Sequence, residues 1–263
     1  MLKCFERKIA IGRSVLPLLV RTNLEIMPIH SSIKRDKFDL FDSLLSSGLK
    51  FREGDIIVVS SKYVSMSEGA VLKLSKVKVS KKARALASEF HMDPKIAEIT
   101  LRESDYICGG IPGFLLAIRD GMIAPNAGID KSNVPPGFVV LYPNDAFKSA
   151  ENLRIKFLKN RKIRVGVVIS DSRLMPTRIG TTGVAIGCSG FEPVEDERGK
   201  RDLFGNVLKV TLKAVADGLA AMGVAIMGEA NEAIPAVVIR GFKVTSTDRK
   251  LSKDDMTIDP THD

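Results

Sequence analysis

Short apolar segments along the chain predict the strands of a mixed structure. Residues 56–59 form a continuous apolar run after the turn signal Gly54-Asp55, which is typical of a buried strand. Residues 163–170 and 235–241 have the same character, and residues 22–29 also have the pattern of a strand. These runs predict a sheet whose central strands are covered on both faces.

Four longer stretches repeat their apolar residues at helical spacing. They are residues 37–46, 81–106, 145–161 and 208–222. Pro94 is expected to begin a second helix within the second stretch, because proline is favoured at the first position of a helix. The sequence therefore predicts several amphipathic helices that pack against the sheet.

The segments between these elements have turn and loop signals. Residues 114–118 are expected to form one arm of a hairpin that turns at Asp120-Gly121, and 138–142 resumes a strand. Residues 191–205 are polar and contain several glycines, which predicts a long loop. The tail, residues 246–263, is polar and without periodicity, so we expect it to be disordered.

Strands and helices mix without a strict alternation, which favours an α+β fold of mixed sheets with packed helices. A chain of 263 residues can bury a substantial core. We expect one catalytic region over residues 22–245, between a basic extension at 1–21 and the tail at 246–263.

Charge and composition narrow the possible partners. The formal net charge is +9, and basic residues gather in 73–84 and 156–164, where few aromatic residues occur and no nucleic-acid-binding module is recognisable. A solvated basic face and attraction of phosphorylated small molecules both remain open. No apolar run approaches the ~20 residues of a membrane span. We therefore expect neither a nucleic-acid nor a membrane partner.

The cysteine content bears on the compartment. Cys4, Cys108 and Cys188 are too few and too scattered for a disulfide framework or a metal knot. They fit a reducing cytoplasm, where buried apolar packing is their expected role.

Two acidic residues follow predicted strands and are the first candidates for chemistry. Asp130 lies in a glycine-containing turn, and Asp171 follows the strand at 163–170, with Ser172 beside it. Mg²⁺ and Mn²⁺ prefer such oxygen ligands, together with substrate phosphates. An Asp in a turn is more often a cap of the local backbone, so the metal hypothesis depends on the two residues converging.

Two further segments could bind anions. Residues 227–235 form a polar loop between a predicted helix and a strand, which would offer N–H groups to phosphate and a carboxylate to a second metal ion. Arg178 lies among hydroxyls and glycines in 176–183, a composition suited to phosphate or carboxylate. The chain has no P-loop and no dinucleotide fingerprint, so any nucleotide site would be unconventional.

The motifs, taken in order, resemble the coenzyme F420-0:L-glutamate ligase family over residues 54–142 and 163–241. Seven segments carry this resemblance: Gly-Asp-Ile-Ile-Val-Val-Ser-Ser-Lys (54–62), Ser-Glu-Gly (67–69), Leu-Arg-Glu-Ser (101–104), Asn-Ala-Gly-Ile-Asp-Lys-Ser-Asn (126–133), Ser-Asp-Ser (170–172), Arg-Ile-Gly-Thr-Thr-Gly-Val-Ala-Ile-Gly (178–187), and the stretch from Met-Gly-Glu to Arg-Gly (227–241).

The resemblance implies a GTP-dependent ligase that joins L-glutamate to a carboxylate of the deazaflavin precursor through an acyl phosphate. It also implies two sites for Mg²⁺ or Mn²⁺, K⁺ as a further candidate ion, and an intertwined homodimer. Metal ions would offset the charge of phosphate meeting carboxylate.

The resemblance also assigns roles to residues of this sequence. It implies a first metal site at Asp130 and Asp171 and a second at Ser172 and Glu229. The implied nucleotide contacts are Ser61, Lys62, Asn133 and the loop that contains Gly228, Glu229, Ala230 and Asn231. The resemblance assigns no role to Arg178, which we propose as a catalytic residue that binds a phosphate or a substrate carboxylate.

Three segments depart from the family pattern. Residues 30–35 replace a Gly-Leu-Pro-Leu-Ile loop, Met66 replaces a lysine, and Arg173-Leu-Met-Pro176 stands where many members have a Gly-Arg-Pro-Trp type sequence. Two alternatives therefore stay open. One is a related nucleotide-dependent ligase with another acceptor or amino acid, and the other is a non-catalytic nucleotide-binding protein.

Overall fold

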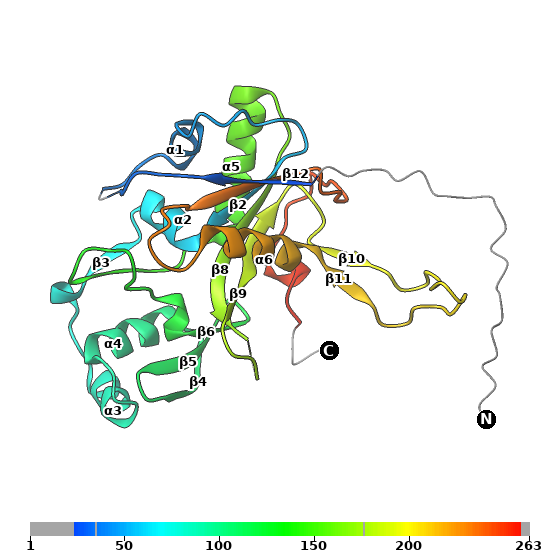
Figure 1. Cartoon of the computed structure of the whole chain (residues 1–263). Coiled ribbons are helices and arrows are strands. Elements are labelled where there is room, and N and C mark those ends of the chain that lie inside the picture. The colour runs from blue at the N-terminus through cyan, green and yellow to red at the C-terminus, as the bar shows by residue number, and fades with distance from the viewer. Residues whose placement is uncertain (1–23, 35, 176, 259–263) are drawn as a thin grey trace, which may run out of the picture.

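A computed structural model describes residues 24–34, 36–175 and 177–258 of the chain (Figure 1). The basic extension predicted at 1–21 lies outside the described residues. The strands are β1 (Glu25–Ile29), β2 (Ile56–Ser60), β3 (Val71–Lys73), β4 (Tyr106–Ile111), β5 (Phe114–Arg119), β6 (Met122–Pro125), β7 (Phe138–Val140), β8 (Gly166–Leu174), β9 (Thr181–Ser189), β10 (Val194–Asp196), β11 (Leu212–Ala214) and β12 (Ala236–Arg240). The helices are α1 (Leu40–Leu45), α2 (Ser61–Glu68), α3 (Lys81–Glu89), α4 (Pro94–Glu103), α5 (Ala146–Arg161) and α6 (Val215–Met227).

A five-stranded mixed sheet forms the centre of the molecule. Its strand order is β1-β12-β2-β8-β9. Strands β2 and β8 are its parallel pair, and their pairing ends where Ser60 lies opposite Ser170. The remaining neighbours pair antiparallel. Ligands of sheets with parallel strands commonly bind beyond the carboxyl ends of those strands.

Helices cover both faces of this sheet. Ile57 and Val59 of β2 pack with α1 and α5, whereas Ile56 and Val58 pack with α6. This split follows from the two-residue period of a strand, which sends successive side chains to opposite faces. The first four residues of β2 are buried, which confirms the sequence prediction of a covered strand.

A smaller lobe, made of α3, α4 and the β4-β5-β6 sheet, lies beside the central sheet (Figure 1). Its own small cluster includes Ala83, Ala97 and Leu115. Asp93 caps α4 by accepting from the N–H of Lys95, and Pro94 occupies the first turn, as the sequence predicts. The chain leaves β6 for a loop at 126–137, so this lobe delivers that loop to the central sheet.

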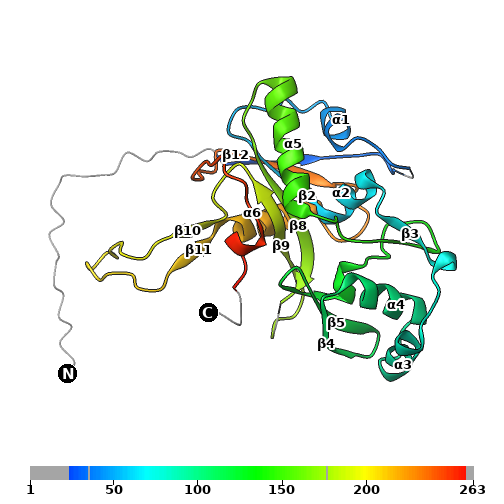
Figure 2. The ribbon, with the colours of Figure 1, turned by 180° about the vertical axis from the view of Figure 1, so that it is seen from behind.

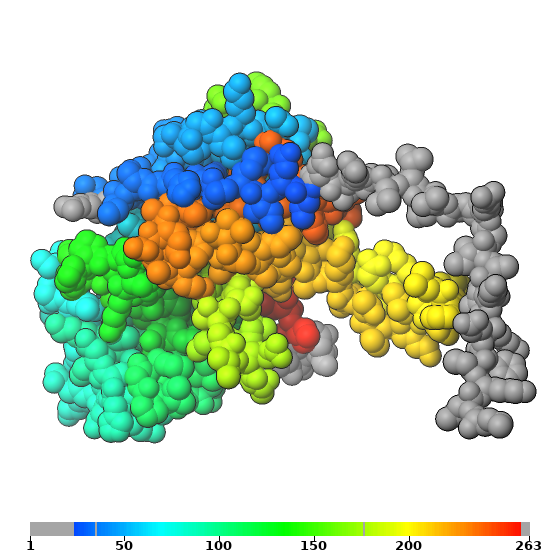
Figure 3. Space-filling view, in the orientation of Figure 1, coloured from blue at the N-terminus to red at the C-terminus, as the bar shows by residue number. Residues whose placement is uncertain are grey.

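A two-stranded arm, β10 and β11 with the residues between them, projects from the body (Figures 1 and 2). The space-filling view shows this arm, in yellow, standing clear of the other described segments (Figure 3). Leu203, Phe204 and Val210 on it are 100%, 92% and 85% exposed.

The mixed-sheet α+β class is confirmed, and three local predictions differ from the structure. The helix predicted at 208–222 is α6, which begins at Val215, because 212–214 pair with β10 instead. The loop predicted at 191–205 contains β10. Cys188 is buried as expected, but Cys108 is exposed and Cys4 lies outside the described residues.

The tail also differs from its prediction of disorder over the described residues 246–258. Leu251 is 5% exposed in the cluster under α6, and residues 253–255 form a short 3₁₀ turn. Arg249 pairs with both Glu192 and Asp255, so charged residues of the tail contact one another and the body. In the described part of the chain, none of the helices combines the length and apolar character needed to cross a bilayer.

Candidate active site

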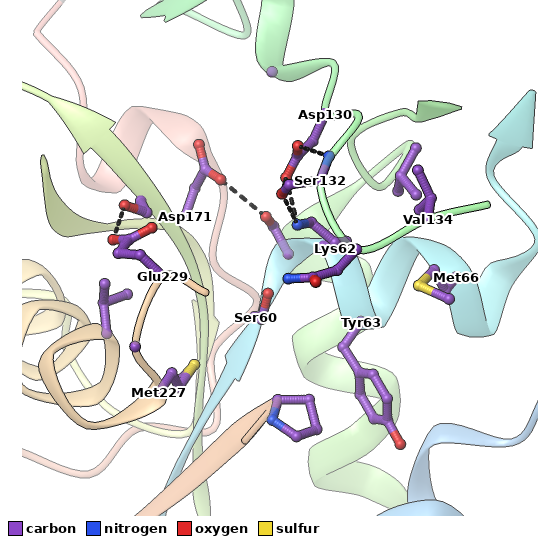
Figure 4. Close-up of a pocket in the computed structure, with 18 of the residues that line it drawn as sticks. Ser60, Lys62, Tyr63, Met66, Asp130, Ser132, Val134, Asp171, Met227 and Glu229 are labelled. Atoms are coloured by element: carbon purple, nitrogen blue, oxygen red, sulfur yellow. Dashed lines mark hydrogen bonds and ion pairs between the residues drawn. The ribbon is translucent and has the colours of Figure 1, made fainter. Parts of the chain in front are cut away.

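A pocket of about 1080 Å³ opens at the carboxyl end of β2, beside the second half of β8. The start of α2, the end of β8, the loop at 126–136 and the loop at 227–235 line it. Single-ligand pockets usually measure roughly 300–1,000 Å³, so this one is at the upper end of that range. Figure 4 shows part of its lining.

Asp130 and Lys62 form one side of the pocket (Figure 4). The Lys62 Nζ lies 2.5 Å from the Asp130 Oδ2 and donates to the Ser132 Oγ at 2.6 Å. Ser132 in turn donates its backbone N–H to Asp130 at 2.7 Å. Burial alone would raise the pKa of Asp130, but Lys62 and Ser132 outweigh burial and lower it. Asp130 is therefore a charged carboxylate held at a fixed place.

Asp171 lies on the opposite side, within β8, because this strand continues to Leu174 and does not end at residue 170 as the sequence predicted. A register shift between Ile169 and Ser170 interrupts the pairing of β8 with β9 just before it. Ser61 donates to its Oδ1 at 3.1 Å, while Tyr142 and Arg173 both donate to its Oδ2. Burial, followed by the charge of Asp171, raises the pKa of Tyr142 well above its ordinary value, which keeps this phenol protonated as a donor.

Glu229 follows α6 and lies near Asp171 (Figure 4). Its Oε1 accepts from the Ser172 Oγ at 2.5 Å and from the Thr181 Oγ1 at 3.0 Å. Gly228 ends the helix with a φ of 73°, and a Cβ there would overlap the Glu232 carboxylate. The turn that delivers Glu229 to the pocket is thus open to glycine and closed to larger residues.

A hydrogen bond joins the two loops that border the pocket. The Asn133 side-chain amide donates to the Ala230 carbonyl at 2.7 Å. Asn133 adopts a φ of 53°, in the left-handed region that asparagine tolerates better than most residues. The predicted nucleotide contacts Ser61, Lys62, Asn133 and 228–231 therefore all line one pocket.

Arg178 lies apart from these residues. It is exposed in the loop between β8 and β9 and is not among the residues that line the pocket. The structure thus brings together the predicted metal and nucleotide residues and leaves the predicted catalytic arginine outside.

The chemistry of the lining fits hard cations. Among its described residues, four carboxylates (Asp130, Asp171, Glu229, Glu232) face three cationic side chains (Lys34, Lys62, Arg173), although the whole chain carries a net charge of +9. No group of three or more His, Cys, Asp or Glu that could hold a metal by itself occurs in the described part of the chain. Mg²⁺ is commonly held by one or two carboxylates with substrate phosphates and water, which suits this donor set.

The Ser170 hydroxyl is a buried hydrogen-bonding group in the lining of the pocket. Ser170 is 1% exposed, and its Oγ has no hydrogen-bond partner among the described residues. Buried hydroxyls are nearly always partnered, by protein or by water. The lining therefore has a buried polar group available to a ligand or to water.

Three residues of the site were not predicted as functional. Arg173 shares a strand face with Asp171 because it lies two positions further along β8, a spacing visible in the sequence. Ser132 follows Asp130 at the spacing of an Asx turn, also a readable signal. Tyr142 lies 29 positions from Asp171 in the sequence, and no local sequence pattern predicts the contact between them.

Comparison with known proteins places the chain in a family. The family model of the F420-0:gamma-glutamyl ligase matches residues 34–241. A coenzyme F420:L-glutamate ligase of Methanopyrus kandleri is 39% identical over 221 residues, covering 84% of this chain and 88% of that protein. One of Methanocaldococcus jannaschii is 42% identical over 193 residues, covering 73% and 77%. Another, of Archaeoglobus fulgidus, is 37% identical over 221 residues, covering 84% and 89%.

The matched region contains nearly the whole of the pocket, including all of its carboxylates. The protein is therefore an enzyme of the ligase class. The chain belongs to the F420-0:gamma-glutamyl ligase family.

Proposed function

We propose that this pocket joins the amino group of L-glutamate to the carboxylate of F420-0 at the expense of GTP. Family membership supports the reaction class. The observation that carries the proposal within the structure is the pair Asp130 and Asp171, presented to one pocket by the adjacent residues Lys62 and Ser61. The pocket measures about 1080 Å³, a large volume for a small-molecule site.

A carboxylate is a poor electrophile, so the reaction needs an activated acyl group. The acceptor carboxylate oxygen attacks the terminal phosphorus of GTP, the bond from that phosphorus to GDP breaks, and an acyl phosphate forms. The glutamate amine then attacks the acyl carbon, loses a proton, and phosphate departs with one former carboxylate oxygen. Holding both substrates in a single pocket makes each step effectively intramolecular.

We propose that Asp130 and Asp171 hold one divalent cation, and that Ser172 and Glu229 contribute to a second. Mg²⁺ or Mn²⁺ would supply electrostatic stabilisation of phosphate oxygens beside the acceptor carboxylate. The acidic lining supports this assignment, since a nucleoside triphosphate would meet repulsion there without cations. Lys62 already pairs with Asp130. A cation at this site would therefore require Lys62 to share the Asp130 carboxylate with the metal or to move away from it.

The nucleotide is assigned to the side of the pocket formed by the start of α2 and the loop at 227–235. The first N–H groups of a helix favour phosphate, and Ser61 and Lys62 occupy the first turn of α2. The hydrogen bond between Asn133 and Ala230 joins the loop at 126–136 to the loop at 227–235. Binding between these loops would replace their direct hydrogen bond by contacts to the ligand.

A homodimer is also proposed, with the β10-β11 arm as the contact. Leu203 and Phe204 are adjacent on the arm and are 100% and 92% exposed, so a second copy that covered them would bury two large apolar side chains. The double substitution Leu203→Asp with Phe204→Asp should convert a dimer to a monomer in light scattering. A wild-type protein that is already monomeric would refute this part.

The reaction is tested with purified protein, L-glutamate, Mn²⁺ and either GTP or ATP, with and without F420-0, followed by mass spectrometry. The proposal predicts a product one glutamyl residue heavier and release of GDP that depends on F420-0. Nucleotide release that depends on another carboxylic acid would instead support a related ligase, which the altered segment at 173–176 makes the second candidate. Absence of glutamyl product with F420-0 under all these conditions would refute the proposal.

A further inference from the structure

Arg173 is a buried cation beside the proposed metal ligand Asp171. It is 6% exposed, and its guanidinium donates to three groups. Nε lies 3.2 Å from the Asp171 Oδ2, Nη2 lies 2.9 Å from the Tyr142 hydroxyl, and Nη1 lies 3.2 Å from the Ile123 carbonyl. The planar guanidinium holds several acceptors in fixed directions, a geometry that the single ammonium group of a lysine does not reproduce.

The partners of Arg173 come from two parts of the molecule. Asp171 belongs to β8 of the central sheet, while Ile123 belongs to β6 of the smaller lobe. Tyr142 lies two residues beyond Val140, whose backbone exchanges hydrogen bonds of 3.0 and 2.9 Å with Asp130. Arg173 therefore links the strand that carries Asp171 to the segment that fixes Asp130.

We propose that Arg173 is a positioning residue that sets the orientation of Asp171 and its separation from Asp130. This inference rests on the proposed metal site. Arg173 and Tyr142 both occupy Oδ2 of Asp171, whereas Oδ1 receives a single bond, from Ser61. Oδ1 is therefore the oxygen that is presented to a cation. Residues that orient metal ligands in this way typically change metal affinity by about 10–100-fold when they are removed.

The molecule contains a matched control for this inference. Arg119 is also buried, at 9% exposed, and its guanidinium lies 5.6 Å from the centre of the Tyr142 ring, close to the 5.5 Å of Arg173. Arg119 pairs with Glu103 at 2.9 Å and makes no hydrogen bond or ion pair with Asp171 in the described part of the structure. Replacing either arginine removes a buried cation beside the Tyr142 ring. Only the replacement of Arg173 also removes a hydrogen bond to Asp171.

The experiment compares Arg173→Met with Arg119→Met. Mn²⁺ binding, with no other ligand, is titrated by electron paramagnetic resonance, and the Mn²⁺ concentration for half-maximal turnover is measured separately. We expect Arg173→Met to weaken Mn²⁺ binding by about tenfold or more, and Arg119→Met to bind Mn²⁺ as the wild type does. Thermal melting of both variants reports their loss of stability independently.

Two milder variants cover the case in which Arg173→Met fails to fold. Arg173→Lys keeps the charge and loses the fork, and Tyr142→Phe keeps the ring and loses the hydroxyl on Oδ2. Both should weaken Mn²⁺ binding. Binding by all Arg173 variants at wild-type strength would overturn the inference while leaving the proposed function intact. A wild-type protein that turns over without binding Mn²⁺ or Mg²⁺ would overturn the metal assignment, and the inference with it.

Discussion

Gly183 allows α6 to lie directly on β9, and replacing it tests how the helix that carries Glu229 is seated. A Cβ at Gly183 would lie 2.6 Å from the carbonyl carbon of Ala220 and 2.9 Å from the backbone nitrogen of Ala221. Both atoms belong to the helix backbone, so neither can turn away as a side chain would. Gly183→Ala must therefore push α6 off the sheet or distort β9.

The expected cost follows from overpacking. Inserting a methyl group into a filled contact costs about 1–3 kcal/mol. A chain near this size loses roughly 2–4 °C in Tm per kcal/mol, so we expect Gly183→Ala to melt roughly 2–12 °C lower. Because α6 ends at the turn before Glu229, turnover of the folded variant should also fall.

Gly218 provides the control, since it lies exposed in α6 with open space around its Cα. Gly218→Ala makes the same chemical change and should stabilise the protein by up to about 1 kcal/mol through helix propensity. Urea unfolding of the three proteins, followed by circular dichroism, measures both effects. Equal stability of Gly183→Ala and wild type would refute the close-contact reasoning, as would a similar loss in both variants.

Three further predictions address the site and the smaller lobe. Asp171→Asn keeps the shape of the side chain and removes its charge, so we expect kcat of the folded variant to fall by about 100-fold or more, and its Tm to fall because the buried Arg173 loses its carboxylate partner; unchanged turnover would defeat the metal assignment. Arg178→Ala should leave kcat/KM nearly unchanged because Arg178 lies outside the pocket lining, and a loss on the order of 100-fold would show that its loop acts in the reaction. Hydrogen bonds from Ser80, then Arg102, lower the pKa of Glu98 to about 2, so the stability that Glu98 contributes is fully present above its unfolded pKa near 4.5 and is lost as the pH falls towards 2. The Tm difference between wild type and Glu98→Gln should therefore shrink as the pH falls from 6 to 2.5, and a difference that does not change with pH would contradict this.

Local pattern predicted the elements of the core well. β2 and β12 are short apolar runs because they are buried on both faces, and α5 runs close to its predicted bounds. The start of α6 could not be predicted in this way. Its helical spacing extends back to Leu208, but residues 212–214 pair with β10 on the arm, and only the tertiary structure decides that competition.

The candidate site also has a part that local sequence patterns predicted and a part that depends on the tertiary structure. Short motifs pointed to Asp130, Asp171 and Glu229, because oxygen ligands at the ends of strands and helices suggest cations. The contacts that orient them join distant segments. Ser61 reaches Asp171 across 110 positions, and no sequence spacing reports that distance in space. The tail was predicted to be disordered from its polarity, yet its charges find partners such as Glu192.

The most direct test of the proposed acyl-phosphate mechanism traces an oxygen atom of the acceptor carboxylate into the released phosphate. F420-0 with a heavy isotope at both oxygens of its acceptor carboxylate is incubated with the enzyme, L-glutamate, GTP and Mn²⁺, and the released phosphate is analysed by mass spectrometry. Transfer through an acyl phosphate predicts glutamylated product and a single heavy oxygen atom in each phosphate released during ligation. Glutamylated product with unlabelled phosphate would contradict the proposed mechanism.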